Sequence, residues 1–205
     1  MITITDFQRG ARGMRVLWLC EEMGLPYTRK LETYPVSADY RARNPLANVP
    51  FLEDGDVGIT ESVAMLIYVA ERYGPTPLLP AKATAAYAQA IQMVVFSETM
   101  LGGYMNPLLM TKFGGAPDDQ KANWTVKALE SELDDRAPAY VAHVLGDRPY
   151  LAGDAFTIAD ISISCAYNLY KGALGRDVPP ALAAWQTRVQ ARPAYQRATA
   201  VAAQG

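Results

Sequence analysis

The feature that most constrains the fold is a proline-rich segment at 74–80, which reads GPTPLLP. Its three prolines remove backbone donors and fix φ, so neither a helix nor a sheet strand continues through it. Strand-like runs occur only before this segment, and the sequence after it is alanine-rich with helical spacing. We therefore expect a domain at 1–74, a linker at 75–80 and an all-helical second domain at 81–205.

The first domain is expected to combine strands and helices. Residues 51–52 and 57–60 are strand-like and flank Asp54-Gly55-Asp56, a sequence typical of a β-hairpin turn. Further strands are predicted at 2–5 and 27–31, and helical segments at 14–23, 37–43 and 62–73. The order β-α-β-α-β-β-α predicts an α/β domain with a mixed sheet covered by helices.

The second domain shows only helical patterns. Helices are predicted at 84–112 with a bend near Pro107, at 118–144 with an interruption near Pro138, at 158–170, at 181–191, and in a short tail after Pro193. Thr157 and Asp160 match a capping box, in which a hydroxyl and an acidic side chain each satisfy a backbone N–H at the helix start.

Composition excludes several classes of protein. The chain has 19 Lys and Arg against 21 Asp and Glu, which does not suggest a nucleic-acid or anionic-membrane surface. No apolar run has the length of a membrane span and no signal peptide is recognisable, so we expect a cytoplasmic protein. Cys20 and Cys165 are expected to be buried thiols, His143 to lie on a helix surface, and no metal to be bound.

The start of the helix after the hairpin is a candidate binding site. Glu61 and Ser62 stand at its first turn, where unpaired N–H groups and the helix dipole favour an anion. A serine in this position also commonly serves only as a helix cap. The residues alone leave both interpretations open.

Five motifs that occur together in this chain resemble those of the cytosolic glutathione S-transferases. They are similar in particular to the motifs of the bacterial beta and theta-like groups. They are NPLANVPFL with the following hairpin and Glu61-Ser62, RVLWLCEEMGLPY from Arg15, the proline linker, FTIAD before the capped helix, and WQTRVQARPAY near the end. The resemblance implies a thioredoxin-like first domain that binds glutathione and a helical second domain that admits a small hydrophobic electrophile. It also implies a homodimer that conjugates the two substrates, as in detoxification.

The resemblance assigns roles to individual residues. Val49-Pro50 is expected to be a cis peptide whose neighbouring backbone pairs with the cysteinyl part of glutathione, and Glu61 with Ser62 to hold the γ-glutamyl group. Asn48 stands near the glycyl carboxylate, where the family often has Lys or Gln. The candidates for the electrophile pocket are Met100, Tyr104 and Tyr167, although a stripe of Met and aromatic residues is more typical of a core.

One departure concerns activation of the thiol. Related bacterial sequences carry a serine four residues before the arginine that matches Arg15, and this chain has Ala11 there. An alignment to the tyrosine-type enzymes places Asp6 or Phe7 at that position instead. We expect the backbone N–H groups of Ala11 and Arg12 and the Arg12 guanidinium to stabilise the thiolate; the alternative is that Arg12 is a solvated loop charge.

Other functions fit the same resemblance. One is an enzyme that uses glutathione for peroxide reduction, isomerisation or dehalogenation. Another is a protein that binds glutathione, or a protein partner, without turnover, since fold alone does not specify reaction.

Overall fold

The computed structural model describes residues 1–8 and 12–204, which form two compact units. The first unit contains Met1–Leu79 together with the residues from Val189 onward, and the second contains Pro80–Arg188. The proline segment therefore leads from one unit to the next. The C-terminal tail belongs to the first unit, whereas the sequence-based division assigned all of 81–205 to the second domain.

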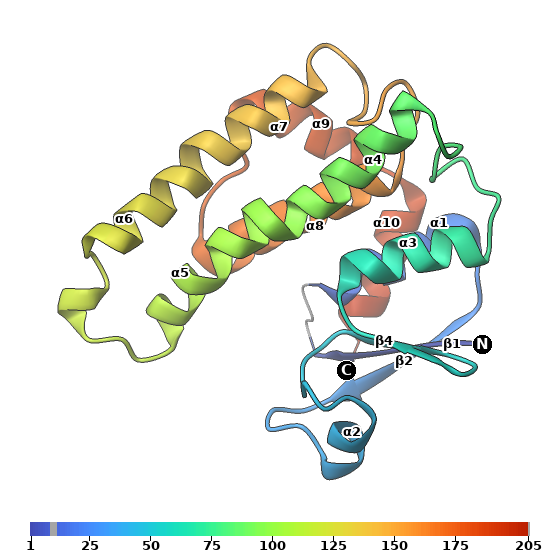
Figure 1. The fold of residues 1–205 in the computed structure, drawn as a ribbon, viewed down its shortest axis with the longest axis horizontal. Helices are drawn as coiled ribbons and strands as arrows, with labels where there is room; N and C mark the ends of the chain where they lie inside the picture. Colours follow the sequence, from blue (N-terminus) through green and yellow to red (C-terminus); the bar gives the residue numbers. More distant parts are fainter. Residues whose placement is uncertain (9–11, 205) are drawn as a thin grey trace. The chain divides into compact units, whose positions relative to one another are not determined.

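The first unit is a four-stranded mixed sheet with helices. Its strands are in the order β2-β1-β3-β4; β1 is parallel to β2 and antiparallel to β3, which is antiparallel to β4. In Figure 1, α1 and α3 lie on one side of the sheet and α2 on the other. The predicted α/β fold and element order are confirmed. The elements are β1 (Ile2–Phe7), α1 (Gly13–Met23), β2 (Tyr27–Glu32), α2 (Ala38–Arg43), β3 (Phe51–Asp54), β4 (Val57–Ile59), α3 (Ser62–Arg72) and, from the tail, α10 (Pro193–Ala202).

Contacts between α1 and α10 explain why the tail groups with the first unit. The fully buried ring of Trp18 on α1 packs edge-on against Tyr195 of α10, with ring centroids 4.7 Å apart. The Trp18 indole N–H donates to Glu22 at 3.0 Å, and Arg192 donates to the same carboxylate from Nε at 2.6 Å and Nη2 at 2.7 Å. A bidentate pair of this kind is stronger than a single exposed ion pair, so it attaches the tail helix firmly to α1.

The second unit is helical throughout its described secondary structure, apart from one isolated bridge between Tyr150 and Gly153. Its helical segments are α4 (Ala85–Phe96), the π-helical η1 (Ser97–Gly102), α5 (Gly103–Phe113), η2 (Asp118–Gln120), α6 (Trp124–Ser131), the π-helical η3 (Glu132–Arg136), α7 (Ala137–Leu145), α8 (Ile158–Leu174) and α9 (Pro180–Gln190), whose last two residues group with the first unit.

The two prolines predicted to disturb helices of this unit, Pro107 and Pro138, stand differently relative to the irregular helical segments. Pro107 lies inside α5, and the departure from α-helical geometry falls before it, at Ser97–Gly102. Pro138 lies in the first turn of α7, which continues directly from the preceding π-helical segment, so its missing N–H removes a backbone donor there. The irregular turn Glu132–Arg136 precedes it, so the predicted interruption near Pro138 is confirmed.

The predicted capping box is present and lies at the centre of a buried network. The Asp160 carboxylate accepts the Thr157 N–H at 2.9 Å, and the Thr157 hydroxyl oxygen accepts the Ala159 N–H at 3.3 Å. Asp160 also accepts from the Leu151 N–H at 3.0 Å and from the Trp185 indole at 2.9 Å. Burial raises the pKa of Asp160, and these donors act in the opposite direction. One carboxylate thus joins the preceding loop, α8 and α9.

Other expectations concern single residues. Cys20 and Cys165 are both buried, and burial raises the pKa of the Cys20 thiol to about 12. His143 is exposed on α7. Within residues 1–8 and 12–204, no helix combines the length and apolarity needed to cross a bilayer.

Candidate functional site at one edge of the sheet

Strand register brings several predicted site residues to one edge of the sheet. The antiparallel pairs Thr5 with Phe51 and Leu52 with Ile59 show that the end of β1, the start of β3 and the end of β4 lie together. The segment before β3 contains Val49 and Pro50, and α3 begins directly after β4. We call the residues Asn48, Val49, Pro50, Glu61, Ser62 and Arg15 the sheet-edge site.

The beginning of α3 is shaped by an unusual backbone. Ser62 is the first helical residue, and Glu61 is the N-cap with φ 63° and no side-chain capping bond. The interpretation of Ser62 as only a cap is therefore wrong, because its side chain makes a different contact. The left-handed φ is uncommon for a non-glycine residue and costs free energy, a pattern found often at binding sites. Glu61 is exposed and directly precedes α3, whose first N–H groups have no acceptor within the helix.

A buried arginine supports this helix start. Arg15 of α1 is only 2% exposed, and its Nη1 donates to Ser62 Oγ at 2.9 Å; Ser62 is 3% exposed. Because the Ser62 oxygen accepts from Arg15, the serine retains a hydroxyl proton to donate elsewhere. Sequence reasoning missed this contact. The sequence feature that indicates burial of Arg15 is its position on the apolar face of the helix, four residues before Leu19.

The turn before β3 is held by side chains of α2 and the residue after it. The Val49-Pro50 peptide is cis, as the resemblance implied. The carbonyl of Asn48 accepts from the Tyr40 hydroxyl at 2.5 Å and from Asn44 Nδ2 at 2.7 Å. The Asn48 side chain is exposed, although its Oδ1 also accepts from Asn44 at 3.1 Å. This bonding fixes the path of the backbone that enters β3.

Asp6 adds a buried carboxyl group at the end of β1. The residue is 1% exposed, its Oδ1 accepts the Phe7 N–H at 2.9 Å, and its Oδ2 has no hydrogen-bond partner in the described part of the chain. Burial raises the pKa of Asp6 to about 6, against the opposing effects of the Phe7 N–H and the Arg29 charge. A Cβ at Gly13 would lie 1.9 Å from Oδ2, so this close approach requires glycine at the start of α1.

The remaining predicted site residues lie elsewhere or are not described. Ala11 falls outside the described residues, and the half-buried Arg12 immediately precedes α1. In the second unit, the Tyr104 hydroxyl lies 3.8 Å from Met100 Sδ, and both residues are partly exposed. Tyr167 is fully buried in α8, and burial raises the pKa of its hydroxyl. The electrophile pocket stays a prediction.

Comparison with known proteins supplies the family context. Residues 5–77 match the model of the glutathione S-transferase N-terminal domain, and residues 103–193 match that of the C-terminal domain. Glutathione S-transferase 3 of Zea mays is 31% identical over 204 residues, covering 91% of this chain and 88% of that protein. A theta class glutathione S-transferase from Xanthomonas axonopodis pv. citri, solved with glutathione bound, is 28% identical with a TM-score of 0.78 over 99% of both chains. A glutathione transferase from Phanerochaete chrysosporium, solved with oxidized glutathione, is 25% identical with a TM-score of 0.82, covering 98% of this chain and 94% of that one.

Proposed function

Since this chain belongs to the glutathione S-transferase family, we propose that it joins the glutathione thiolate to small hydrophobic electrophiles. The observation that carries the proposal is the buried contact of Arg15 with Ser62 at the sheet edge. A buried cation and a helix N-terminus next to an exposed carboxylate suit a ligand with both an anionic and a cationic group. Solved relatives that hold glutathione support this assignment.

The γ-glutamyl end of glutathione carries an ammonium and a carboxylate on one carbon. In the proposed complex, the exposed carboxylate of Glu61 receives the ammonium. The ligand carboxylate accepts from the Ser62 hydroxyl and the first N–H groups of α3, with Arg15 behind them. The Val49 backbone beside the cis bond to Pro50 pairs with the cysteinyl part.

The glycyl end and the thiol complete the proposed complex. Asn48 lies near the glycyl carboxylate, where its exposed amide offers an uncharged donor. Arg12, which immediately precedes α1, stabilises the thiolate together with the N–H groups at the start of that helix. A free thiol has a pKa of about 8.5, and each unit of lowering requires about 1.4 kcal/mol. Measuring the thiol pKa of bound glutathione in Arg12→Ala tests this role, and an unchanged value removes Arg12 from the mechanism.

The principal test replaces Ser62 by alanine. A hydrogen bond to a charged group contributes about 1.5–3 kcal/mol, so Ser62→Ala is expected to weaken glutathione binding about tenfold to a hundredfold. Calorimetric titration measures this change. The matched control is Ser37→Ala, which removes the serine that caps α2 in the same unit by accepting the Tyr40 N–H. That control should lower stability by about 1 kcal/mol and leave glutathione affinity unchanged.

Activity on a generic aryl halide, measured beside affinity, separates the remaining functions. Conjugation that falls in parallel with affinity in Ser62→Ala supports the transferase. Tight binding by the wild type without conjugation favours a binding protein, a function that the absence of a serine at Ala11 makes worth testing. Equal affinity of Ser62→Ala and wild type would contradict the proposed site.

The physiological assembly and location belong to the same proposal. We expect a homodimer in the cytoplasm, as the family resemblance implies. Sedimentation velocity across a range of protein concentrations measures the assembly, and a monomer at all concentrations would oppose it.

A further inference from the structure

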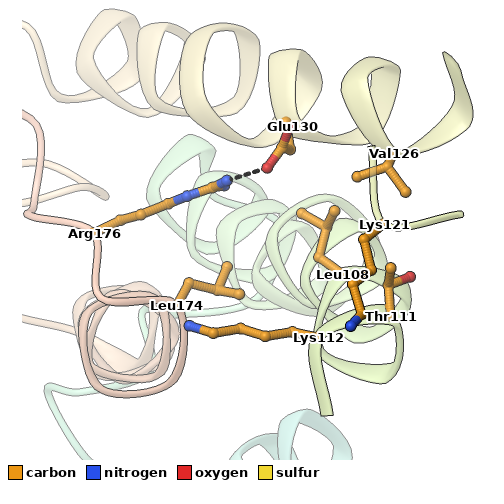
Figure 2. Close-up of a pocket in the computed structure, with 8 residues that line it drawn as sticks. All are labelled: Leu108, Thr111, Lys112, Lys121, Val126, Glu130, Leu174 and Arg176. Carbon is orange, nitrogen blue, oxygen red and sulfur yellow. Dashed lines mark hydrogen bonds and ion pairs between the residues drawn. The ribbon is translucent and has the colours of Figure 1, made fainter. Parts of the chain in front are cut away.

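The second unit contains a cavity of about 350 Å³, shown in Figure 2, around which the charges balance one another. Arg176 donates to Glu130 and to Asp134, at 2.7 Å in each case, and Lys121 pairs with Asp118 at 2.7 Å. In all, three cations and three carboxylates surround the cavity, and they are Lys112, Lys121, Arg176, Glu130, Asp134 and Asp118. The described residues around this cavity therefore leave no net charge that would select a ligand.

The buried carboxyl group of Asp6 in the first unit has no such balance. The residue is 1% exposed, and only its Oδ1 accepts a hydrogen bond, from the Phe7 N–H. Its Oδ2 is buried and has no donor in the part of the chain that the structure describes. Both oxygens of an ionised carboxylate are strong acceptors, so a buried oxygen without a donor is costly. Such groups are uncommon in folded proteins and indicate strain or a functional role.

The unpartnered Oδ2 of Asp6 is directed at the start of α1. A Cβ on Gly13, the first residue of α1, would lie 1.9 Å from Oδ2 and 2.5 Å from the carboxyl carbon. The carboxyl group therefore lies against the first turn of this helix. That turn contains no acidic residue, and its N-cap Arg12 makes no side-chain capping bond. The first N–H groups of α1 and the positive end of its dipole are thus next to a buried carboxyl group.

The charged and titratable groups around Asp6 do not supply the missing donor. They belong to the elements packed on β1, to α2 and to the residue before α1, and they are Arg29, Arg15, Arg12, Tyr40 and Glu53. Arg29 pairs with Ile4, so it lies on the same face of the sheet as Asp6. Its charge favours the ionised carboxyl, but burial has the larger effect and raises the pKa of Asp6 to about 6. Within the described residues, none of these groups donates to Oδ2.

The position of Asp6 couples its charge to that of a bound thiolate. In the proposed complex the glutathione thiolate accepts from the same first turn of α1, so this role of Asp6 rests on the proposed function. Two negative charges at one helix start repel each other, and each raises the pKa of the other acid. An ionised Asp6 therefore opposes loss of the thiol proton, and a thiolate favours protonation of Asp6. Two groups that interact this strongly titrate as a pair.

We propose that Asp6 controls the ionisation of the glutathione thiol bound at the start of α1. The charged carboxyl group holds the proton on the sulfur, and the protonated carboxyl group allows the thiolate to form. When the sulfur loses its proton near neutral pH, Asp6 gains one from the sulfur or from solvent, so the pair keeps a single negative charge. Asp6 acts through its charge, without contact with the electrophile, and it makes thiolate formation depend on pH.

The test is a titration of bound glutathione in the variant Asp6→Asn, whose amide has nearly the same shape and no charge. The ultraviolet absorbance of the thiolate, measured with saturating glutathione from about pH 5 to 9, follows the ionisation. The variant is expected to lower the pKa of the bound thiol by about one unit, a tenfold rise in the ratio of thiolate to thiol. Asp6→Ala removes the same charge and should give the same shift. The control Asp56→Asn changes an exposed aspartate in the turn at the other end of β3, and should leave the thiol pKa unchanged.

A second measurement separates charge from packing. S-methylglutathione has the same peptide groups as glutathione, but its sulfur does not ionise. At about pH 8, Asp6→Asn should strengthen calorimetric binding of glutathione by up to about tenfold and leave binding of S-methylglutathione within about twofold of the wild type. A change of packing at the site would alter the affinity for both ligands alike.

Two results would overturn the role of Asp6 alone. The first is a thiol pKa in Asp6→Asn and Asp6→Ala that equals or exceeds that of the wild type while glutathione is bound. The second is an equal change of affinity for glutathione and S-methylglutathione. Failure of both ligands to bind the wild type would instead contradict the proposed function, and the role of Asp6 with it.

Discussion

The buried carboxyl of Asp6 makes stability depend on pH in a defined direction. Its pKa is about 6 in the folded chain against an ordinary value of 3.8, because burial disfavours the charged form. Between these two values the folded chain keeps a proton that the unfolded chain has lost. The free energy of unfolding therefore falls as pH rises through this window, and stays lower above it.

Replacing Asp6 by asparagine removes this loss. The amide side chain of the variant Asp6→Asn has no charge to bury, and its oxygen can still accept the Phe7 N–H. A raised pKa of this size corresponds to an upper limit of about 3 kcal/mol. We expect Asp6→Asn to be more stable than the wild type by up to this amount near pH 8, with the difference disappearing near pH 4.

Urea unfolding followed by circular dichroism across this pH range measures the difference. The control is Asp56→Asn, which changes an exposed aspartate in the turn between β3 and β4 and should leave the free energy of unfolding within about 0.5 kcal/mol of the wild type. An Asp6→Asn variant that is less stable than wild type near pH 8 would refute the reasoning. A stability difference that does not vary with pH would refute it as well.

Three further substitutions test the packing described above. Gly13→Ala places a Cβ 1.9 Å from Asp6 Oδ2 and should lower the free energy of unfolding by about 1–3 kcal/mol, as measured in urea. In an Asp6→Ala background the same substitution should cause a smaller loss. Equal losses in both backgrounds would contradict the clash. Thr157→Ala removes the hydroxyl of the capping box and should lower the free energy of unfolding by about 1 kcal/mol, while Thr157→Ser retains most of it. Trp185→Phe keeps an aromatic ring but removes a donor to Asp160, so calorimetry should show a loss of about 1–3 kcal/mol; an unchanged melting temperature would show that the bond contributes nothing.

Much of the secondary structure was predictable because its signals are local. The hairpin turn at Asp54-Gly55-Asp56, the start of α3 and the capping box at Thr157 each depend on residues a few positions apart. The separation of a strand-bearing part from a helical part followed from the prolines of 74–80 in the same way. Glu61 and Ser62 could be selected as candidates because they are adjacent at a helix start.

The tertiary structure alone decided which distant residues meet. Arg15 and Ser62 are separated by 47 positions, and Arg192 reaches Glu22 across 170, so no local pattern specifies either contact. The burial of Asp6 and the cavity in the second unit likewise depend on packing of separate segments. Periodicity and turn chemistry act over single helical turns and tight loops, whereas a buried cation or a pocket exists only after several elements have packed together. For this protein, sequence determined the elements and their order, and packing determined the chemistry of the sites.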